Sequence, residues 1–189
     1  PVFLPTVILA DGLNSASLES YQVVILCNVA SLPDSFTAKL PSFLQAGGGL
    51  LIFSGDKFQP ENYNQRLSRD LPGQVGEKKL GPEANGEKIG KFDAGHPALQ
   101  FLSDSILQES IKSARVWGYF RTAGARSALI SLANGDPLLV EQKIGAGKVI
   151  FMTTAADRDW TDLPLKTAYL PLIQSLAQYL AGGKRGGLD

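Results

Sequence analysis

The fold is decided by two apolar runs, Tyr21-Gln-Val-Val-Ile-Leu-Cys-Asn-Val29 and Gly47-Gly-Gly-Leu-Leu-Ile-Phe-Ser-Gly-Asp56. Short continuous apolar runs are typical of strands covered on both faces, so both runs are expected in the middle of a sheet. Between them, apolar residues recur at helical spacing at Phe36, Leu40, Phe43 and Leu44. A strand, a helix and a parallel strand in one sheet cross over right-handed. The sequence therefore predicts an α/β domain whose ligands lie beyond the carboxyl ends of its strands.

Local signals mark both ends of the intervening helix. Ser31 followed by Asp34 resembles a capping box at its start. Gly47 suits the left-handed conformation that ends a helix, and the two glycines after it allow a close reversal into the next strand. Pro41 is a cost inside this helix, because it removes a backbone donor.

Composition excludes several function classes. The chain has 189 residues and 44% hydrophobic content, enough for one cored domain, which we place at residues 1–181. Its 18 basic and 18 acidic side chains produce no net field, so nucleic acid is not an expected partner. The one cysteine, Cys27, cannot form an internal disulfide, and its apolar run predicts a buried small hydrophobe. No run approaches the roughly 20 apolar residues that span a bilayer, so direct membrane insertion is not expected.

The segments around the central unit are less regular. Val2–Leu9 is predicted as a first strand that Pro5 interrupts, with an edge open to pairing. Residues 57–91 are rich in Gly, Pro, Asn, Glu and Lys and are predicted to form a long excursion over the sheet, with a helical patch at Tyr63–Leu71. This excursion is either a lid or partner surface, or mobile decoration. A further strand is expected over Ala114–Arg121.

The C-terminal half turns β-rich. It contains three apolar runs, Ala128–Leu132, Leu138–Lys143 and Lys148–Thr154, separated by Asn134-Gly-Asp136 and Gly145-Ala-Gly147. Such tight-turn signals between apolar runs predict hairpins. We therefore expect a flavodoxin-like, mostly parallel sheet with helices on both faces and an antiparallel β extension near the C-terminal half.

A last helix and a tail close the chain. The helix is predicted from a buried stripe formed by Leu165, Tyr169, Leu172, Ile173, Leu176 and Leu180. Pro171 interrupts it for no evident reason. Residues 182–189 have the composition of a flexible linker. Because the chain starts without a methionine and close to an expected strand, it is expected to be excised from a longer protein.

The order of these features is similar to one superfamily. Tyr21–Leu26, Gly47–Phe53, Gly95-His96-Pro97, Gly145–Phe151 and Asp157-Arg-Asp-Trp160 together resemble the class I glutamine amidotransferase-like superfamily. The chain looks most like its ThuA-like (trehalose-utilisation) branch and the related domains of Bat-type aerotolerance membrane proteins. The resemblance implies a flavodoxin-like sheet and a soluble domain of a bacterial inner-membrane protein, on an unspecified side of the membrane. The implied partners are other domains of that parent protein or its complex.

The chain departs from the superfamily at the nucleophile. Catalytic members resemble one another in a cysteine at the strand-to-helix elbow, with a histidine and an acid further along, because a thiolate needs a base and oxyanion donors. The matching position here is about Ser54, and the sole histidine is His96. A triad of Ser54, His96 and Asp157 can be written, but the Gly-x-Ser-x-Gly framing of a serine nucleophile is absent. The other interpretation of Ser54 is a small residue that closes a strand.

Further polar and aromatic side chains are candidates for ligand binding. The full set of candidates is Ser54, Asp56, His96, Asp157, Asp159 and Trp160. Asp157, Asp159 and Asp162, with Asp56 nearby, offer oxygen ligands for Mg²⁺ or Ca²⁺, but three close acids more often form a solvated helix start, so no metal is predicted. Trp160 either stacks on a sugar or partner side chain or packs in the core. Without zinc-ligand companions for His96 or a phosphate-binding glycine motif, no cofactor is predicted.

These observations favour a pseudoenzyme. We expect a non-catalytic, amidotransferase-like interaction or ligand-sensing module of a larger bacterial membrane-anchored protein. The alternative is a serine-dependent hydrolase, or a carbohydrate-processing or carbohydrate-binding domain, that uses Ser54, His96 and the late aspartates. Fold analogy alone does not choose between them.

Overall fold

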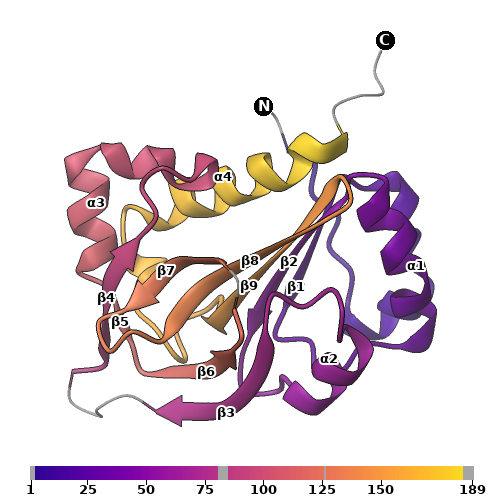
Figure 1. The fold of residues 1–189 in the computed structure, drawn as a ribbon, viewed down its shortest axis with the longest axis horizontal. Coiled ribbons are helices and arrows are strands. Elements are labelled where there is room, and N and C mark those ends of the chain that lie inside the picture. Colours follow the sequence, from indigo (N-terminus) through magenta and orange to yellow (C-terminus); the bar gives the residue numbers. More distant parts are fainter. Residues whose placement is uncertain (1–2, 81–84, 126, 185–189) are drawn as a thin grey trace.

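A computed structural model describes residues 3–80, 85–125 and 127–184 (Figure 1). The main sheet has the strand order β1-β2-β9-β8-β7-β4-β5, and a second sheet pairs β3 with β6. The strands are β1 (Val23–Cys27), β2 (Gly49–Ser54), β3 (Gln74–Leu80), β4 (Glu87–Phe92), β5 (Arg115–Val116), β6 (Gly118–Ala123), β7 (Ser127–Leu132), β8 (Pro137–Ile144) and β9 (Gly147–Ala155). The α-helices are α1 (Asp34–Gln45), α2 (Pro60–Arg66), α3 (Ser105–Lys112) and α4 (Tyr169–Ala181). Short 3₁₀ helices are η1 (Ala10–Asn14), η2 (Leu18–Ser20), η3 (Pro97–Ser103), η4 (Leu163–Leu165) and η5 (Gly182–Lys184).

The parallel part of the main sheet is the unit that the sequence predicts. β1 pairs in parallel with β2, and β2 with β9, while α1 connects β1 to β2. Gly47 ends α1 with φ of 91°, the left-handed conformation expected of it. The predicted flavodoxin-like α/β fold is confirmed.

The antiparallel extension is confirmed as well. β8 pairs with β9 through a regular ladder from Leu139–Met152 to Ile144–Gly147, and β7 pairs with β8. Gly135 and Gly145, with φ of 91° and 58°, occupy the two predicted turns. The strand expected over Ala114–Arg121 is divided into β5 and β6, because the backbone N–H of Trp117 between them donates to the carbonyl of Trp160.

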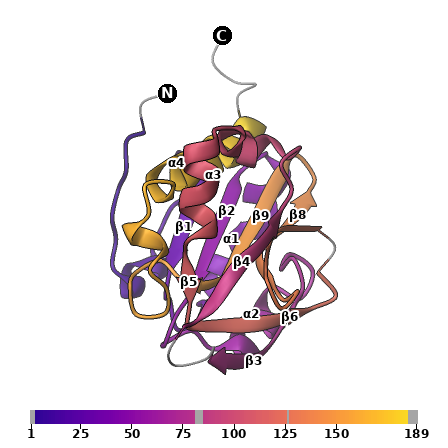
Figure 2. The ribbon, with the colours of Figure 1, turned by 90° about the vertical axis from the view of Figure 1, so that its left-hand side faces the viewer.

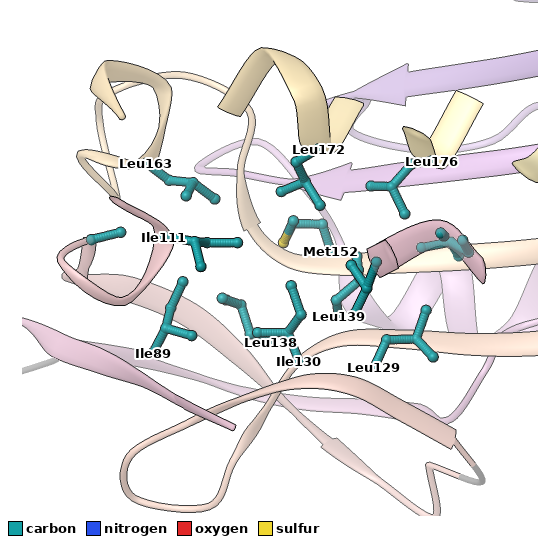
Figure 3. Close-up of a cluster of buried hydrophobic side chains, with 14 of the residues drawn as sticks. Ile89, Ile111, Leu129, Ile130, Leu138, Leu139, Met152, Leu163, Leu172 and Leu176 are labelled. Carbon is teal, nitrogen blue, oxygen red and sulfur yellow. The ribbon is translucent and has the colours of Figure 1, made fainter. Parts of the chain in front are cut away.

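Two hydrophobic layers enclose the main sheet. On one face, α4, α3 and η3 cover a cluster that includes Met152, Leu172 and Leu176 (Figure 3). On the other face, α1 and α2 cover a second cluster that includes Leu40 and Tyr63. Figure 1 shows α1 and α4 on different sides of the strands. The helices therefore lie on both faces, as predicted.

The structure shows how two helices accommodate the prolines that the sequence places inside them. Pro171 is the third residue of α4, within the first turn, where a backbone N–H has no intrahelical acceptor. Pro41 lies inside α1 on its exposed side. Because proline has no backbone N–H, the carbonyl of Thr37 lacks its helical hydrogen bond, and this loss falls at the surface. Leu165 precedes α4 in η4 and is exposed, so its assignment to the buried stripe was wrong.

The predicted capping box is wrong. α1 begins at Asp34 with Pro33 as its N-cap, and no side chain caps the helix. Ser31 lies three residues before the helix and is exposed. Pro33 accounts for the shift, because its fixed φ sets an extended entry directly before the first helical residue.

The expectations for the first strand of the sheet need correction. β1 is the terminal strand of the sheet rather than a central one, and therefore Cys27 is exposed instead of buried. In the segment predicted as a first strand, Val2 lies outside the described residues, and Phe3–Leu9 is extended and exposed but belongs to neither sheet. An apolar run alone does not distinguish an edge strand or an unpaired segment from a central strand.

Residues 81–84 of the long excursion lie outside the described residues, and the rest of 57–91 is more ordered than its composition indicates. It contains α2, β3 and β4, and its helical patch spans Pro60–Arg66 instead of Tyr63–Leu71. β3 pairs with β6, and β4 extends the main sheet next to β7. Pairing with distant strands, which composition does not reveal, organises this segment.

The first three residues of the predicted linker are helical. Within residues 182–189, Gly182–Lys184 forms η5, and residues 185–189 lie outside the described part of the chain. Gly183 fits against the carbonyl oxygens of Gly47 and Ala146, where an added Cβ would lie 2.5 Å from each. Over the described residues, no helix is both long and apolar enough to cross a bilayer.

Candidate functional site

Ser54, the candidate nucleophile of the sequence, ends β2. Its side chain is completely buried, and its hydroxyl donates a hydrogen bond of 2.7 Å to the carbonyl oxygen of Thr153 in β9. The pairing of β2 with β9 shifts register at this point, so that Ser54 lies opposite Ala155. The hydroxyl thus joins two parallel strands at an irregularity of the sheet.

His96 lies at the N-cap of η3. Its Nδ1 accepts a hydrogen bond of 3.2 Å from the backbone N–H of Ala98, and its Nε2 lies 3.3 Å from Oε2 of Glu141 in β8. Because Nδ1 accepts, the ring hydrogen is assigned to Nε2, which donates to the carboxyl group. The ring thus caps the start of η3 through the backbone two residues further on.

The carboxyl group of Glu141 organises a buried polar cluster. Its Oε1 accepts a hydrogen bond of 2.6 Å from the hydroxyl of Tyr179 in α4. The Tyr179 ring meets the His96 ring edge-on, with centroids 4.7 Å apart. Burial, followed by the hydrogen bond to Glu141, raises the pKa of Tyr179. The sequence signal for this cluster is a charged residue directly after the apolar run Leu138–Val140.

The three residues of the proposed triad hydrogen-bond to different partners and not to one another. Ser54 is bonded to the backbone of β9, while both ring nitrogens of His96 are occupied by Ala98 and Glu141. Asp157 is exposed after β9, where its Oδ1 accepts from the backbone N–H of Asp159 at 3.1 Å. A proton cannot pass from a hydroxyl to an imidazole nitrogen that already holds another donor.

Asn28 and Asp56 form a polar contact at the carboxyl ends of β1 and β2. Nδ2 of Asn28 donates to Oδ1 of Asp56 at 2.6 Å, and Oδ1 of Asn28 accepts from the backbone N–H of Lys57 at 3.0 Å. Asn28 has φ of 51°, a left-handed conformation that asparagine tolerates better than most residues. The hydrogen bond from Asn28, aided by the charge of Lys57, lowers the pKa of Asp56. Sequence reasoning missed Asn28, although it directly follows an apolar run.

Cys27, Asp157 and Tyr169 interact at the same end of the sheet. Tyr169 donates to the carbonyl oxygen of Ala156 at 2.7 Å, next to Asp157. Burial and the charges of Cys27 and Asp157 raise the pKa of Tyr169 to about 12. Although Cys27 is an exposed residue, partial burial of its thiol and then the charge of Asp157 raise the pKa of that thiol.

The other predicted site residues have structural roles. Asp162 is turned toward the backbone N–H of Arg115, at 2.7 Å, and toward the ammonium of Lys166, at 2.9 Å. Among the residues that the structure describes, no three His, Cys, Asp or Glu side chains gather as metal ligands. Trp160 is only 8% exposed and packs beside Phe120, so its ring belongs to the core.

A hollow of the described surface lies away from these residues. An open groove of about 650 Å³ runs between α2, β3 and β8, with a polar lining that includes Arg69, Gln74 and Gln142. Nε2 of Gln142 donates to the carbonyl of Arg69 across it, at 2.7 Å. A smaller hollow of about 240 Å³ lies between Asn14 of η1 and the segment Val29–Pro33.

No protein-family model and no curated protein matches this chain. The cytoplasmic protein STM3548 from Salmonella typhimurium is similar in structure, with a TM-score of 0.70 and 19% identity over 90% of this chain and 78% of that one. The cytoplasmic protein STM1381 from Salmonella typhimurium LT2 has a TM-score of 0.68 and 18% identity over 87% and 75% of the two chains. A β-galactosidase from Bacillus circulans sp. alkalophilus has a TM-score of 0.58 and 15% identity over 88% of this chain and 24% of that enzyme. At these identities the likeness concerns the fold alone.

Proposed function

We propose that this chain is a non-catalytic, amidotransferase-like interaction or ligand-sensing module of a larger bacterial membrane-anchored protein. The observation that carries the proposal is the state of Ser54, which is completely buried and donates its hydroxyl hydrogen to the Thr153 carbonyl at 2.7 Å. A serine nucleophile must reach its substrate and transfer its proton to a base. Ser54 is placed for neither task.

The arrangement of His96 supports the same proposal. Its two ring nitrogens are engaged by the backbone of η3 and by Glu141, and the ring is only 9% exposed. These contacts join η3, β8 and α4, so the histidine stabilises the packing of three elements. A general base would instead direct a free nitrogen toward the reacting group.

The structural neighbours support a modular role. The fold of this chain corresponds to about a quarter of the β-galactosidase from Bacillus circulans, so in that enzyme it is one part of a longer protein. The resemblance to Bat-type membrane proteins supplies the rest of the proposal: the partners are other domains of a parent inner-membrane protein or its complex. The side of the membrane is left open.

If the module senses a ligand, the polar contact between Asn28 and Asp56 is the place we propose for it. Both side chains lie at the carboxyl ends of parallel strands, where α/β proteins bind their ligands, and Asp157 is exposed at the end of the neighbouring β9. Carboxylates and an amide at this edge would select a cationic or hydroxylated ligand.

A hydrolase assay tests the absence of catalysis. The wild-type protein, Ser54→Ala and His96→Gln are compared on activated esters, amides and nitrophenyl glycosides. We expect the same background rate for all three proteins and for buffer alone. Turnover by the wild type that Ser54→Ala removes, with the melting temperature nearly unchanged, would support the serine-dependent hydrolase instead.

A further inference from the structure

Among the described residues, the main-chain groups on the outer edge of β1 have no strand partner. β1 is the last strand of the sheet and, among the described strands, pairs only with β2. In this pairing the N–H of Gly49 donates to the carbonyl oxygen of Gln22 at 2.9 Å, and the N–H of Asn28 donates to the carbonyl oxygen of Phe53 at 3.1 Å. In a parallel ladder, alternate residues of a strand bond to the same neighbour. Because Gln22 and Asn28 face β2, the N–H and C=O groups of Val23, Ile25 and Cys27 point away from the sheet.

This edge lacks the devices that protect edge strands. Natural edges carry lysines, prolines, bulges or inward-pointing charges that prevent pairing with another chain. Val23–Cys27 contains none of them, and residues 20–33 include no charged side chain. Ile25 is 43% exposed on this strand. Neither a charge nor a proline on β1 itself therefore opposes the addition of a further strand.

Several large apolar side chains of the described residues are exposed. They come from the N-terminal segment Phe3–Leu9, from β1 and from the approach to α4, namely Phe3, Leu4, Val7, Ile8, Leu9, Ile25, Leu165 and Leu170. Ala10, at the end of the N-terminal segment, lines a hollow together with Val29 just beyond β1. α4 packs against β1. Figure 2 shows the N-terminal segment running down the outside of the molecule. We call the Phe3–Leu9 segment, β1 and Leu170 the edge face.

We propose that the edge face binds a second copy of this chain, with the two β1 strands paired antiparallel about a two-fold axis at Ile25. Ile25 then lies opposite its symmetry mate, and Val23 lies opposite Cys27 of the second copy. The result is one continuous sheet across two protomers. The inference goes beyond the proposed function, because it holds whether or not the protein is catalytic.

The chemistry of the edge favours a second copy as the occupant. A two-fold interface requires a surface that complements itself, and a strand edge does so in the antiparallel arrangement because donors and acceptors alternate. The absence of charge from residues 20–33 means that symmetry brings no like charges together. A strongly acidic or basic partner would find no opposite charge on β1 and would gain no electrostatic specificity there.

The size of the contact requires more than β1. A stable interface buries about 800 Å² on each partner, and the edge of one five-residue strand is too small for that. The apolar side chains of Phe3–Leu9 and Leu170 must therefore be covered as well. Leu4 and Val7, each 90% exposed, have the most apolar surface to lose. The dimer thus explains both the open edge and the apolar segment beside it.

The oligomeric state tests this inference. Sedimentation velocity of the wild-type chain over a range of concentrations should show a dimer that dissociates on dilution. Ile25→Lys introduces two like charges at the two-fold axis and should sediment as a monomer at the same concentrations. The matched control is Ile106→Lys on α3, where an apolar side chain is 75% exposed away from β1. It should dimerise like the wild type.

Circular dichroism and melting curves establish that both lysine variants are folded. A wild type that stays monomeric at its highest soluble concentration overturns the inference, and so does a dimer that Ile25→Lys leaves intact. Hydrolase activity does not enter this test, so its failure is distinct from a failure of the proposed function.

A cross-link tests the arrangement of the strands. In Cys27→Ser/Ile25→Cys, the two new thiols face each other across the axis, at about the 5.5 Å Cα separation of a hydrogen-bonded antiparallel pair, which a disulfide can bridge. Mild oxidation should produce a covalent dimer. Cys27→Ser/Ile106→Cys should remain monomeric on a non-reducing gel. A wild-type dimer without the cross-link at position 25 would overturn the pairing of the two β1 strands.

Discussion

His96 and Glu141 meet inside the protein, with Nε2 of the imidazole 3.3 Å from Oε2 of the carboxyl group. The second oxygen of Glu141 accepts from Tyr179 at 2.6 Å, so one carboxyl group joins η3, β8 and α4. Glu141 is 4% exposed. A buried polar group with all its partners fixes one arrangement of the elements around it, whereas a buried group without a partner is costly.

Replacement of Glu141 should therefore destabilise the fold according to the acceptors that remain. Glu141→Leu keeps volume but leaves the Tyr179 hydroxyl and the His96 Nε2 hydrogen without acceptors, so we expect a loss of about 3 kcal/mol in unfolding free energy. Glu141→Gln retains one acceptor oxygen and should lose about 1 kcal/mol. Urea unfolding at neutral pH measures both. Lys143→Ala, an exposed position on the same strand, serves as control and should change stability by less than about 0.5 kcal/mol. Equal losses for Leu and Gln would contradict the role of the acceptor oxygens.

Gly49 should not tolerate a side chain. A Cβ on this residue would lie 2.5 Å from Cβ of Leu180 and 2.9 Å from its carbonyl oxygen. Because these atoms belong to the end of α4, the helix would have to move away from β2. We expect Gly49→Ala to lose about 3 kcal/mol of unfolding free energy. The control is Gly182→Ala just beyond α4, where nothing lies within 4 Å of the added Cβ, and its stability should stay within about 0.5 kcal/mol. Denaturant titration measures the unfolding free energy of both variants. Similar values for Gly49→Ala and Gly182→Ala would refute the close packing of α4 on β2.

The central unit could be predicted because its signals are local. Gly47 ends a helix through its own φ, and the apolar runs of β1 and β2 lie on either side of that helix. The position of β1 could not be predicted, because an apolar run does not specify how many neighbours a strand has. The edge position, and with it the exposure of Ile25 and Cys27, follows from the return of β9 on the other side of β2.

The candidate site was only partly accessible from sequence. Asp56 and Asp157 do lie at the carboxyl ends of strands, where the pattern places them. His96 and Glu141 are 45 positions apart, so the charged residue after an apolar run indicates a buried Glu141 but does not indicate its partner. Ser54 is a similar case, since its partner is a backbone carbonyl 99 positions away. Residue types alone suggested a triad, whereas side-chain direction decides which groups meet.

The buried stripe of α4 should carry much of the stability of its layer. Leu172 and Leu176 are completely buried, and Figure 3 shows them among the apolar side chains below α4. Alanine at either position creates a cavity, and we expect the free energy of unfolding to fall by about 2–5 kcal/mol. In an Ile25→Lys background, which keeps the edge face free of a second copy, Leu170→Ala is the matched control, because that leucine is 63% exposed on the same helix. Its effect should stay below about 0.5 kcal/mol. Thermal melts of the three variants decide the matter, and a Leu172→Ala protein as stable as Leu170→Ala would mean that α4 packs differently.

Cys27 should react slowly with alkylating reagents. The thiolate is the reactive form, and partial burial together with the negative charge of Asp157 raises the pKa of this thiol, so less thiolate is present at pH 8 than in a free cysteine. Asp157→Asn removes the charge while keeping the oxygen that accepts from Asp159. The thiol pKa should then fall, and alkylation at pH 8 should become about two- to threefold faster.

Iodoacetamide alkylation followed by mass spectrometry measures this rate, in an Ile25→Lys background that keeps β1 free of a second copy. Asp159→Asn is the control: its carboxyl group does not contribute to the raised pKa of the thiol, so its rate should equal that of the parent. The difference between Asp157→Asn and the parent should shrink as the pH rises above the thiol pKa, because both thiols are then ionised. If Asp157→Asn reacted at the parental rate at pH 8, the charge of Asp157 would not act on Cys27, and the contact between the ends of β1 and β9 would be refuted.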